Sequence, residues 1–203
     1  MKHPADCHER LIEAARQLFA QKGYDGASVR EITGRARTNL GAITYHFGSK
    51  EALYHAVIER FAVPIADRLA SIADEPAPPI ERLATVLRAF FEHMGQHPEM
   101  PSLILRELAS DRPLPEPVAR VISRNIQSIG RIIAEGQADG TIRPGEPALI
   151  AMTIAAHPLF LALASRPLRH ALGTDPRDPA VRARIAEHVI ATLKGGLASP
   201  VTP

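Results

Sequence analysis

The sequence contains few cysteine and aromatic residues. Cys7 is the only cysteine among 203 residues, so no disulfide can form within the chain, and we expect a reducing, cytoplasmic compartment. Tryptophan is absent, aromatic residues make up only 4%, and no stretch alternates polar and apolar residues as a half-buried strand does. The first ten residues, MKHPADCHER, lack the apolar stretch of a signal peptide. These absences favour a helical protein that carries no secretion signal.

Positive and negative charges nearly balance over the chain as a whole. The net charge is +2, which argues against a protein that coats nucleic acid with its entire surface. One segment, 28–50, is locally basic, with four cations against the single anion Glu31: Arg30, Arg35, Arg37 and Lys50. An anionic partner would therefore be met at this segment.

One apolar run is long enough to require a membrane test. Residues 148–165 are 18 residues without a formal charge, about 27 Å of helix at ~1.5 Å per residue. Thr153 and the pair His157-Pro158 lie within this run and are unfavourable in lipid. A helix that is apolar all round is otherwise buried, either inside a bundle or between two subunits. We therefore expect burial and no membrane span.

The chain is predicted to be helical almost throughout. A first helix runs from about Ala5 to Lys22 and ends at Gly23, and later helices are expected at 80–96, 102–109, 116–138, 146–172 and 179–197, with most prolines at the joints. A helix from 49 to 73 is capped by Ser49 and contains Pro64, where we expect a kink. The predicted fold class is all-α, with a three-helix domain at 1–48 followed by a larger helical bundle at 49–203, and helix 49–73 connects the two.

Two short helices near the N-terminus have the spacing of a helix-turn-helix. The first, 28–35, begins with a capping box formed by Ser28 and Glu31, and the second, 39–47, is expected to begin with Asn39 as its N-cap and to end before Gly48. Three residues join them, and the second helix of such a pair enters the DNA major groove.

Winding the second helix separates its side chains into two faces. Ile43 and Phe47, with Leu40 beside them, are predicted to pack inward. Gly41 and Tyr45 are predicted to point outward, flanked by Ala42 and Thr44. Small outward residues allow the backbone to approach a duplex, and the Tyr45 hydroxyl can reach a phosphate oxygen. Taken alone, the run Tyr45-His46-Phe47 could also belong in part to the hydrophobic core.

The run VREITGRARTNLGAITYHFGSKEALYHAVI resembles the DNA-binding domain of the TetR/AcrR family of one-component bacterial repressors. The shared features are a recognition helix that ends in aromatic-His-Phe, a following Ser-Lys-Glu helix start, and an upstream amphipathic helix with a Gly-Tyr turn, over 11–58. Three positions depart from the family, since Arg37 and Thr38 stand where glycine and then an apolar residue are common, and Leu40 where a polar or basic residue is common. Leu40 could pack inward or touch a thymine methyl group, but it cannot donate to a base. Arginine at positive φ would cost about 1 kcal/mol, so either the turn differs or Arg37 is kept for a DNA contact.

The resemblance implies contacts to double-stranded DNA, at a palindromic operator, from a set of residues around the helix-turn-helix. That set is Ser28, Arg30, Arg37, Thr38, Asn39, Leu40, Gly41, Ala42, Thr44, Tyr45, His46 and Lys50. It further implies a homodimer, which the last two long helices are suited to form.

The resemblance also implies a cavity for a small apolar or amphipathic effector in the second domain. The candidate lining residues are Phe61, Phe90, Phe91, Met94, Leu103, Met152, His157 and Phe160, with Arg106 and Glu107 as polar anchors. For most of these side chains, filling the core is the competing interpretation.

Other classes of protein remain as alternatives. The rear bundle could recognise a protein partner, which would make the chain a DNA-binding adaptor. His93 and His97 have the i, i+4 spacing of helical metal ligands, but the sequence indicates no third ligand and contains no nucleophile-elbow, phosphate-loop, dinucleotide-binding or HExxH motif. We therefore predict neither an enzyme nor a cofactor.

Overall fold

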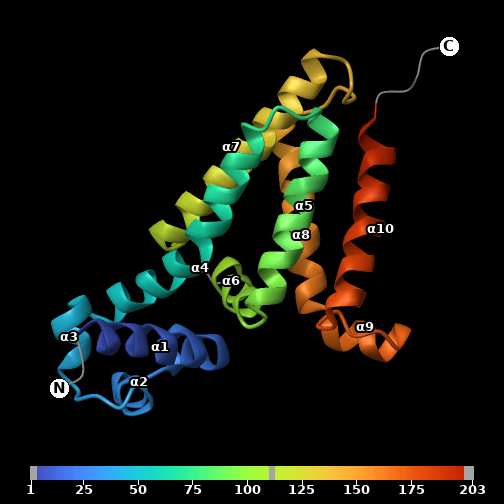
Figure 1. Ribbon diagram of the computed structural model, residues 1–203. Helices are drawn as coiled ribbons and strands as arrows, with labels where there is room; N and C mark the ends of the chain where they lie inside the picture. Colours follow the sequence, from blue (N-terminus) through green and yellow to red (C-terminus); the bar gives the residue numbers. More distant parts are fainter. Residues whose placement is uncertain (1–3, 110–112, 199–203) are drawn as a thin grey trace. The chain divides into compact units, whose positions relative to one another are not determined.

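The computed structural model describes residues 4–109 and 113–198, and in this part of the chain the regular structure is helical (Figure 1). The helices are α1 (Pro4–Gly26), α2 (Val29–Arg35), α3 (Ala42–Phe47), α4 (Lys50–Ala73), α5 (Pro79–Gln96), α6 (Met100–Leu108), α7 (Glu116–Ala138), α8 (Pro147–Leu163), α9 (Ser165–Leu172) and α10 (Pro179–Leu197). The predicted all-α fold is confirmed.

The chain forms two compact units. Unit 1 contains Met1–Val63 and Ser102–Ala119, and unit 2 contains Pro64–Pro101 and Arg120–Pro203. Helix α4 contributes to both, because its first part, up to Val63, belongs to unit 1 and Pro64 opens unit 2. Pro64 has no N–H to donate to the preceding turn, so the helical hydrogen bonding is interrupted at this unit boundary.

Unit 1 is held together by an apolar core beneath α1, α2 and α3. Leu11, Phe19, Ile32, Ile43 and Leu53 are almost completely buried there. Helix α1 is interrupted at its predicted end, since Gly23 has a φ of 74° and a ψ of 178° and leaves the helical conformation. The capping box of α2 is present as predicted, with Ser28 and Glu31 each bonded to the other's backbone N–H.

The N-cap of helix α3 lies two residues later than the sequence suggested. Its N-cap is Gly41, and Asn39 lies in the preceding turn, where its carbonyl accepts a hydrogen bond from the Ala42 N–H at 3.2 Å. The expectation that Asn39 caps the helix is therefore wrong. The physical reason is the way in which α2 ends. The Thr38 N–H donates to the Thr33 carbonyl at 3.0 Å, and the residues that follow Thr38 form the turn that reverses the chain before α3 can begin. The predicted end at Gly48, which has a φ of 82°, is confirmed.

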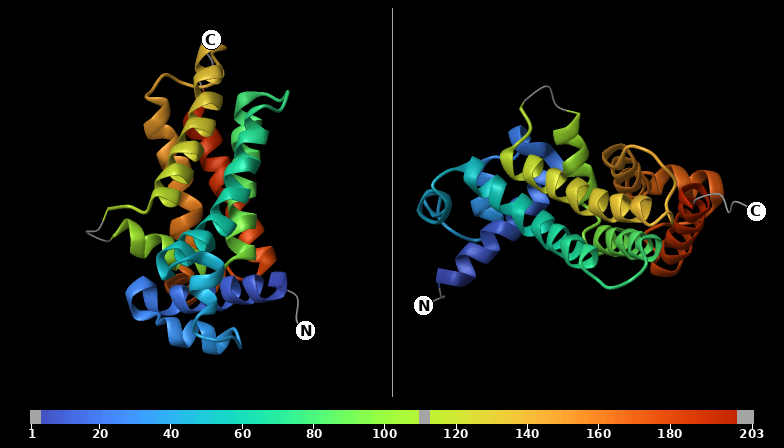
Figure 2. Two further views of the ribbon diagram at one scale, coloured as in Figure 1. Left: turned by 90° about the vertical axis from the view of Figure 1, so that its left-hand side faces the viewer. Right: turned by 90° about the horizontal axis from the view of Figure 1, so that it is seen from above.

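Unit 2 is a bundle in which α5 packs against both α8 and α10, and Figures 1 and 2 show these three helices side by side. Its core also draws on the second part of α4 and on α7, and includes Leu69, Leu87, Ile129, Ile154 and Ile190. The inner face of α7 includes the buried residues Val118, Ile129, Ile133 and Gly136, and Ile126 packs against the core.

The expected single helix over 146–172 is in fact two helices. Helix α8 ends at Leu163, and α9 restarts at Ser165. Pro167 explains the break, because proline lacks the N–H that a continuous helix would donate to Leu163 and is tolerated in the first turn of a new helix instead.

Helix α8 is buried on one face only. Ala151 and Ile154 are fully buried, whereas Leu149, Met152 and Phe160 are exposed, Phe160 to 68%. Burial on all sides within the bundle, one of the two predicted surroundings, is therefore wrong. Among the described residues no helix is both long enough and apolar enough to cross a membrane.

Candidate functional site

The outer face of α3 presents small residues and one aromatic ring to solvent. Tyr45 is 81% exposed, and Gly41 and Thr44 are exposed beside it. Ile43 is buried on the opposite side, in the core of unit 1. The predicted separation of an outer face from an inner one is confirmed for these residues.

Two neighbouring residues are oriented opposite to the prediction. Ala42 is only 6% exposed and belongs to the core, although an outward position was expected. Leu40 is 59% exposed, although it was expected to pack beside Ile43. The error at Leu40 arises because this residue precedes the first helical residue, so its side chain does not follow the helical winding. Leu40 is thereby available at the surface, where an apolar side chain can contact a thymine methyl group.

Cationic side chains lie around this face. Arg30 and Arg37 are exposed, as is the uncharged Asn39. Lys50 begins α4, with its ammonium nitrogen 4.3 Å from the centre of the Tyr24 ring. The Ser49 hydroxyl accepts a hydrogen bond from the Ala52 N–H at 3.0 Å and thereby caps α4. The remaining N–H groups of that first turn, with Lys50 beside them, suit a phosphate group.

The turn between α2 and α3 contains the one described non-glycine residue with positive φ. Arg37 has a φ of 54°, so the turn has the left-handed conformation in which the family commonly has glycine. Of the two possibilities that the sequence left open, a different turn is therefore excluded. The strain of about 1 kcal/mol at Arg37 is retained, and the guanidinium is exposed.

Ser28, at the start of α2, is engaged in capping. Its hydroxyl donates to Glu31 Oε2 at 2.8 Å and accepts from the Glu31 N–H at 3.2 Å. The hydrogen bond from Lys22, and then those from Ser28, lower the pKa of the Glu31 carboxyl to about 2. This network fixes the start of α2, and with it the direction in which α2 leads into the turn.

Two residues that the sequence analysis did not select lie behind the end of α3. The ring of His8 stacks on Phe47, with the centroids 4.6 Å apart, and its centroid is 6.1 Å from that of His46, which is half-buried. Cys7 Sγ lies 3.5 Å from the Thr38 hydroxyl. Both contacts join positions more than thirty residues apart, and no local pattern signals them.

The predicted effector residues are divided between the two units. Phe61 and Leu103 are buried in unit 1, where the exposed Arg106 guanidinium donates to the Gln21 carbonyl at 3.3 Å and Glu107 is buried. In unit 2, Phe90 belongs to the core, while Met152 and Phe160 are exposed. His157 is half-buried, with Nδ1 2.7 Å from the Thr153 carbonyl.

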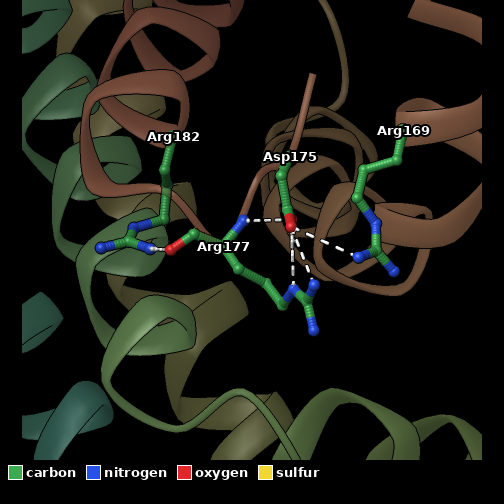
Figure 3. Close-up of polar contacts among 4 residues, drawn as sticks. All are labelled: Arg169, Asp175, Arg177 and Arg182. Carbon is green, nitrogen blue, oxygen red and sulfur yellow. Dashed lines mark hydrogen bonds and ion pairs between the residues drawn. The ribbon is translucent and has the colours of Figure 1, made fainter. Parts of the chain in front are cut away.

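Unit 2 contains a cavity of about 160 Å³ between α5, α8 and α10. Of the predicted residues, Phe91 and Met94 line it. The other lining residues are Gly95, Pro98, Pro158, Leu161, Ala162, Pro176, Arg177, Arg182 and Ile185. Figure 3 shows the arginines at this cavity, with Arg177 paired to Asp175 and the Arg182 guanidinium meeting the Arg177 carbonyl. The cavity is thus apolar on one side and cationic on another.

The histidine pair proposed as metal ligands does lie together, with ring centroids 4.9 Å apart for His93 and His97. The described residues contain no group of three or more His, Cys, Asp or Glu side chains that could hold a metal ion. A zinc site needs at least three protein ligands, so this pair alone does not provide one.

Comparison with known families agrees with this arrangement. The family model described as bacterial regulatory proteins, tetR family, matches residues 11–57, and the one described as tetracyclin repressor-like, C-terminal domain, matches residues 79–193. The chain belongs to the TetR family. The TetR family consists of DNA-binding transcriptional regulators and not of enzymes, so the chain is a helix-turn-helix transcription regulator of bacterial type.

Individual relatives are similar over most of the chain. The transcriptional repressor KstR2 of Mycolicibacterium smegmatis is 30% identical over 144 residues, which is 70% of each chain. The transcriptional repressor DhaR of Mycobacterium sp. strain GP1 is 29% identical over 140 residues, covering 66% of this chain and 69% of DhaR. The solved structure of Bacillus subtilis FadR in complex with stearoyl-CoA shares the fold, with a TM-score of 0.76, 20% identity, and coverage of 93% of this chain and 98% of FadR.

Proposed function

We propose that this TetR-family regulator is a repressor that binds a palindromic operator as a homodimer and leaves it when a small apolar or amphipathic molecule binds in unit 2. The observation that carries the DNA-binding part is the outer face of α3. Tyr45, Thr44 and Gly41 are exposed there while Ile43 is buried, so the face is complementary to a groove and not to the protein's own core. The relatives KstR2 and DhaR, both named as repressors, support the direction of regulation.

In this proposal the residues around α3 have two kinds of task. Arg30, Arg37, Tyr45 and Lys50 contact phosphates, which supplies affinity and fixes the register of the helix on the duplex. Thr44 and the exposed Leu40 approach base edges, where a hydroxyl and an apolar side chain read different groups. Ala42 acts indirectly, because its burial sets the depth at which α3 sits in unit 1.

The dimer in this proposal forms through α8 and α10. Leu149, Met152 and Phe160 are three and eight residues apart, so they share one face of α8, and all three are exposed in the single chain. Several large apolar side chains exposed on one helix face are typical of a subunit interface. Two copies of the α8–α10 pair would meet about a twofold axis and form a four-helix interface.

The effector response in this proposal depends on α4. This helix begins with Lys50 at the DNA face and contains Pro64 where unit 2 begins, so a change in unit 2 can alter the position of the helix start. The support for a small ligand is the cavity between α5, α8 and α10. Pro64→Ala should change the response to a ligand more than the affinity for DNA without ligand, measured by binding titrations.

The proposal is tested by selecting DNA fragments from a random pool with the purified protein and sequencing them. A recovered palindrome with half-sites about one helical turn, or a multiple, apart supports it. Recovery of fragments without a common sequence contradicts specific repression. Small molecules are then screened for those that release the protein from the selected DNA. Such release distinguishes a ligand sensor from an adaptor that responds to a protein partner.

A further inference from the structure

Two arginines, Arg177 and Arg182, line the cavity in unit 2, and Asp175 and Arg169 lie beside Arg177. Arg177 binds Asp175 through Nε and Nη2, with a shortest distance of 2.8 Å, and Arg169 Nη1 lies 3.5 Å from the same carboxylate (Figure 3). The hydrogen bonds from Arg177 lower the pKa of Asp175 to about 2, so this carboxylate is ionised. Asp175 therefore neutralises one of the two arginines that it contacts, and a positive charge remains beside it.

Of the two arginines that line the cavity, Arg177 is paired with Asp175, whereas Arg182 has no carboxylate partner among the described residues. Its Nη1 donates to the Arg177 carbonyl at 3.4 Å, which is a long hydrogen bond. Asp178 lies one helical turn before Arg182, at the spacing of a helical ion pair. The Asp178 carboxylate is used differently, since it accepts from the Ala180 N–H at 2.8 Å and caps α10. The Arg182 guanidinium, half-buried at the cavity wall, thus retains donors for an acceptor that the described chain does not supply.

Gly95 on α5 holds the Arg182 guanidinium in place. A Cβ at position 95 would collide with the central carbon of that guanidinium and would lie only 2.7 Å from its Nη1. The absence of a side chain at Gly95 therefore creates the space in which the guanidinium lies against α5. The position of the cation is determined by packing and not only by its own flexible chain.

The rest of the wall is apolar. Phe91, Met94, Leu161 and Ile185 line the cavity together with Pro158, which lies inside α8 and has no N–H for the helical hydrogen bonding there. The volume is about 160 Å³, and a protein cavity of about 150 Å³ accommodates a benzene ring. The cavity therefore suits an apolar body of about six to eight carbon atoms.

We infer that this cavity binds a monocarboxylate with a small apolar body, whose carboxylate is held by Arg182 and whose carbon chain or ring lies on Phe91, Met94 and Leu161. A carboxylate matches a guanidinium in charge and in bidentate geometry, and partial burial strengthens the pair. The inference names the chemical class of the effector and so rests on the proposed ligand response.

The test measures binding by calorimetry on the full chain without DNA, with octanoate, 4-phenylbutyrate and benzoate as probes and octanamide as the uncharged match of octanoate. We expect at least one of the three carboxylates to bind, and octanoate to bind about tenfold tighter than octanamide, because an ionic hydrogen bond is lost in the amide. Arg182→Gln should abolish this preference for the acid. Gly95→Ala, which keeps the charge but displaces the guanidinium, should weaken it, and Arg184→Gln, an exposed position on the same helix, should leave it unchanged.

Absence of binding by all three carboxylates, equal binding of octanoate and octanamide, or an unchanged preference in Arg182→Gln would each overturn the inference. The DNA selection described above is independent of these measurements. If the selection recovers a palindrome but none of the carboxylates binds, the repressor proposal is retained and monocarboxylates are excluded as the effector class. Carboxylate binding that depends on Arg182 but leaves operator binding unchanged would support the site and contradict its role as the effector site.

Discussion

The ring of His8, in the second turn of α1, stacks on the ring of Phe47 at the end of α3, with an angle of 26° between the ring planes. The stack connects the start of the chain to the recognition helix. Because α3 has only six residues, it is too short to be stable by itself and depends on such tertiary contacts.

We expect His8→Ala to lower the free energy of unfolding by about 0.5–1.5 kcal/mol, the range of an aromatic pair beyond its buried area. Affinity for the selected DNA should fall as well, since the end of α3 loses its support. Chemical denaturation and a DNA titration measure the two effects. His8→Phe keeps a stacking ring and should retain both properties, and a loss of stability as large as that of His8→Ala would contradict the stacking role.

The sequence predicted the helical composition and the outer face of α3, but not the contacts that hold α3 in place. Periodicity is a local property, so the exposure of Tyr45 and the burial of Ile43 follow from winding alone. The start of α3 was misjudged because Asn39 is a better N-cap than Gly41 by propensity, whereas the closure of α2 around Arg37 places Asn39 in the turn. That closure depends on the positive φ of Arg37, which the sequence left open as one of two possibilities.

The cavity was harder to predict for a similar reason. Its walls come from α5, α8, α10 and the segment before α10, and which sides of these helices meet depends on packing over long sequence distances. Phe91 and Met94 were predicted to line a cavity because of their residue types alone. No sequence pattern indicated Arg182, because the place of its guanidinium depends on Gly95, 87 positions earlier, which provides space by having no side chain.

Tyr45→Ala should reduce affinity for the selected operator about tenfold or more while changing the free energy of unfolding by less than about 0.5 kcal/mol. The side chain is 81% exposed, so its removal takes few contacts from the folded state. A phosphate contact, by contrast, contributes directly to DNA binding. Fluorescence anisotropy with labelled operator and thermal unfolding provide the two readouts. Tyr45→Phe isolates the hydroxyl, and unchanged operator affinity in Tyr45→Ala would remove this residue from the interface.

Arg37→Gly should separate stability from DNA binding. Glycine adopts positive φ without the strain of about 1 kcal/mol that arginine carries, so the free energy of unfolding should rise by about that amount. Loss of one phosphate contact should lower DNA affinity across sequences and reduce the slope of log affinity against log salt by about one. Arg37→Asn tolerates the same backbone conformation without the charge and serves as the control. Unchanged affinity and slope in Arg37→Gly would mean that the strained arginine has no DNA contact.

If the protein forms the proposed homodimer through α8 and α10, Phe160→Glu should convert it to a monomer. The residue is 68% exposed in the single chain and shares a face of α8 with Leu149 and Met152, so a carboxylate there would be buried without a partner if two copies met at this face. Sedimentation at several concentrations measures the oligomeric state. Gln127→Glu, which adds the same charge at an exposed position on α7, is the matched control. A Phe160→Glu protein that remains dimeric would place the interface elsewhere.

Ser28→Ala should destabilise unit 1 by about 1 kcal/mol, because the N-cap of α2 loses its acceptor.

Glu31, the partner of Ser28 in this capping box, adds a pH dependence. The pKa of Glu31 is lowered from 4.5 to about 2 in the folded chain, so its contribution is fully present above pH 4.5 and is lost as the pH falls towards 2. Unfolding curves between pH 2 and pH 7 should therefore show wild type losing stability in this acid range, and Ser28→Ala should lose less, since it lacks part of the network that lowers the pKa. Ser28→Thr keeps a capping hydroxyl and should retain the stability at neutral pH. If wild type and Ser28→Ala had parallel pH profiles, the Ser28–Glu31 hydrogen bonds would not contribute to the acid sensitivity of the fold.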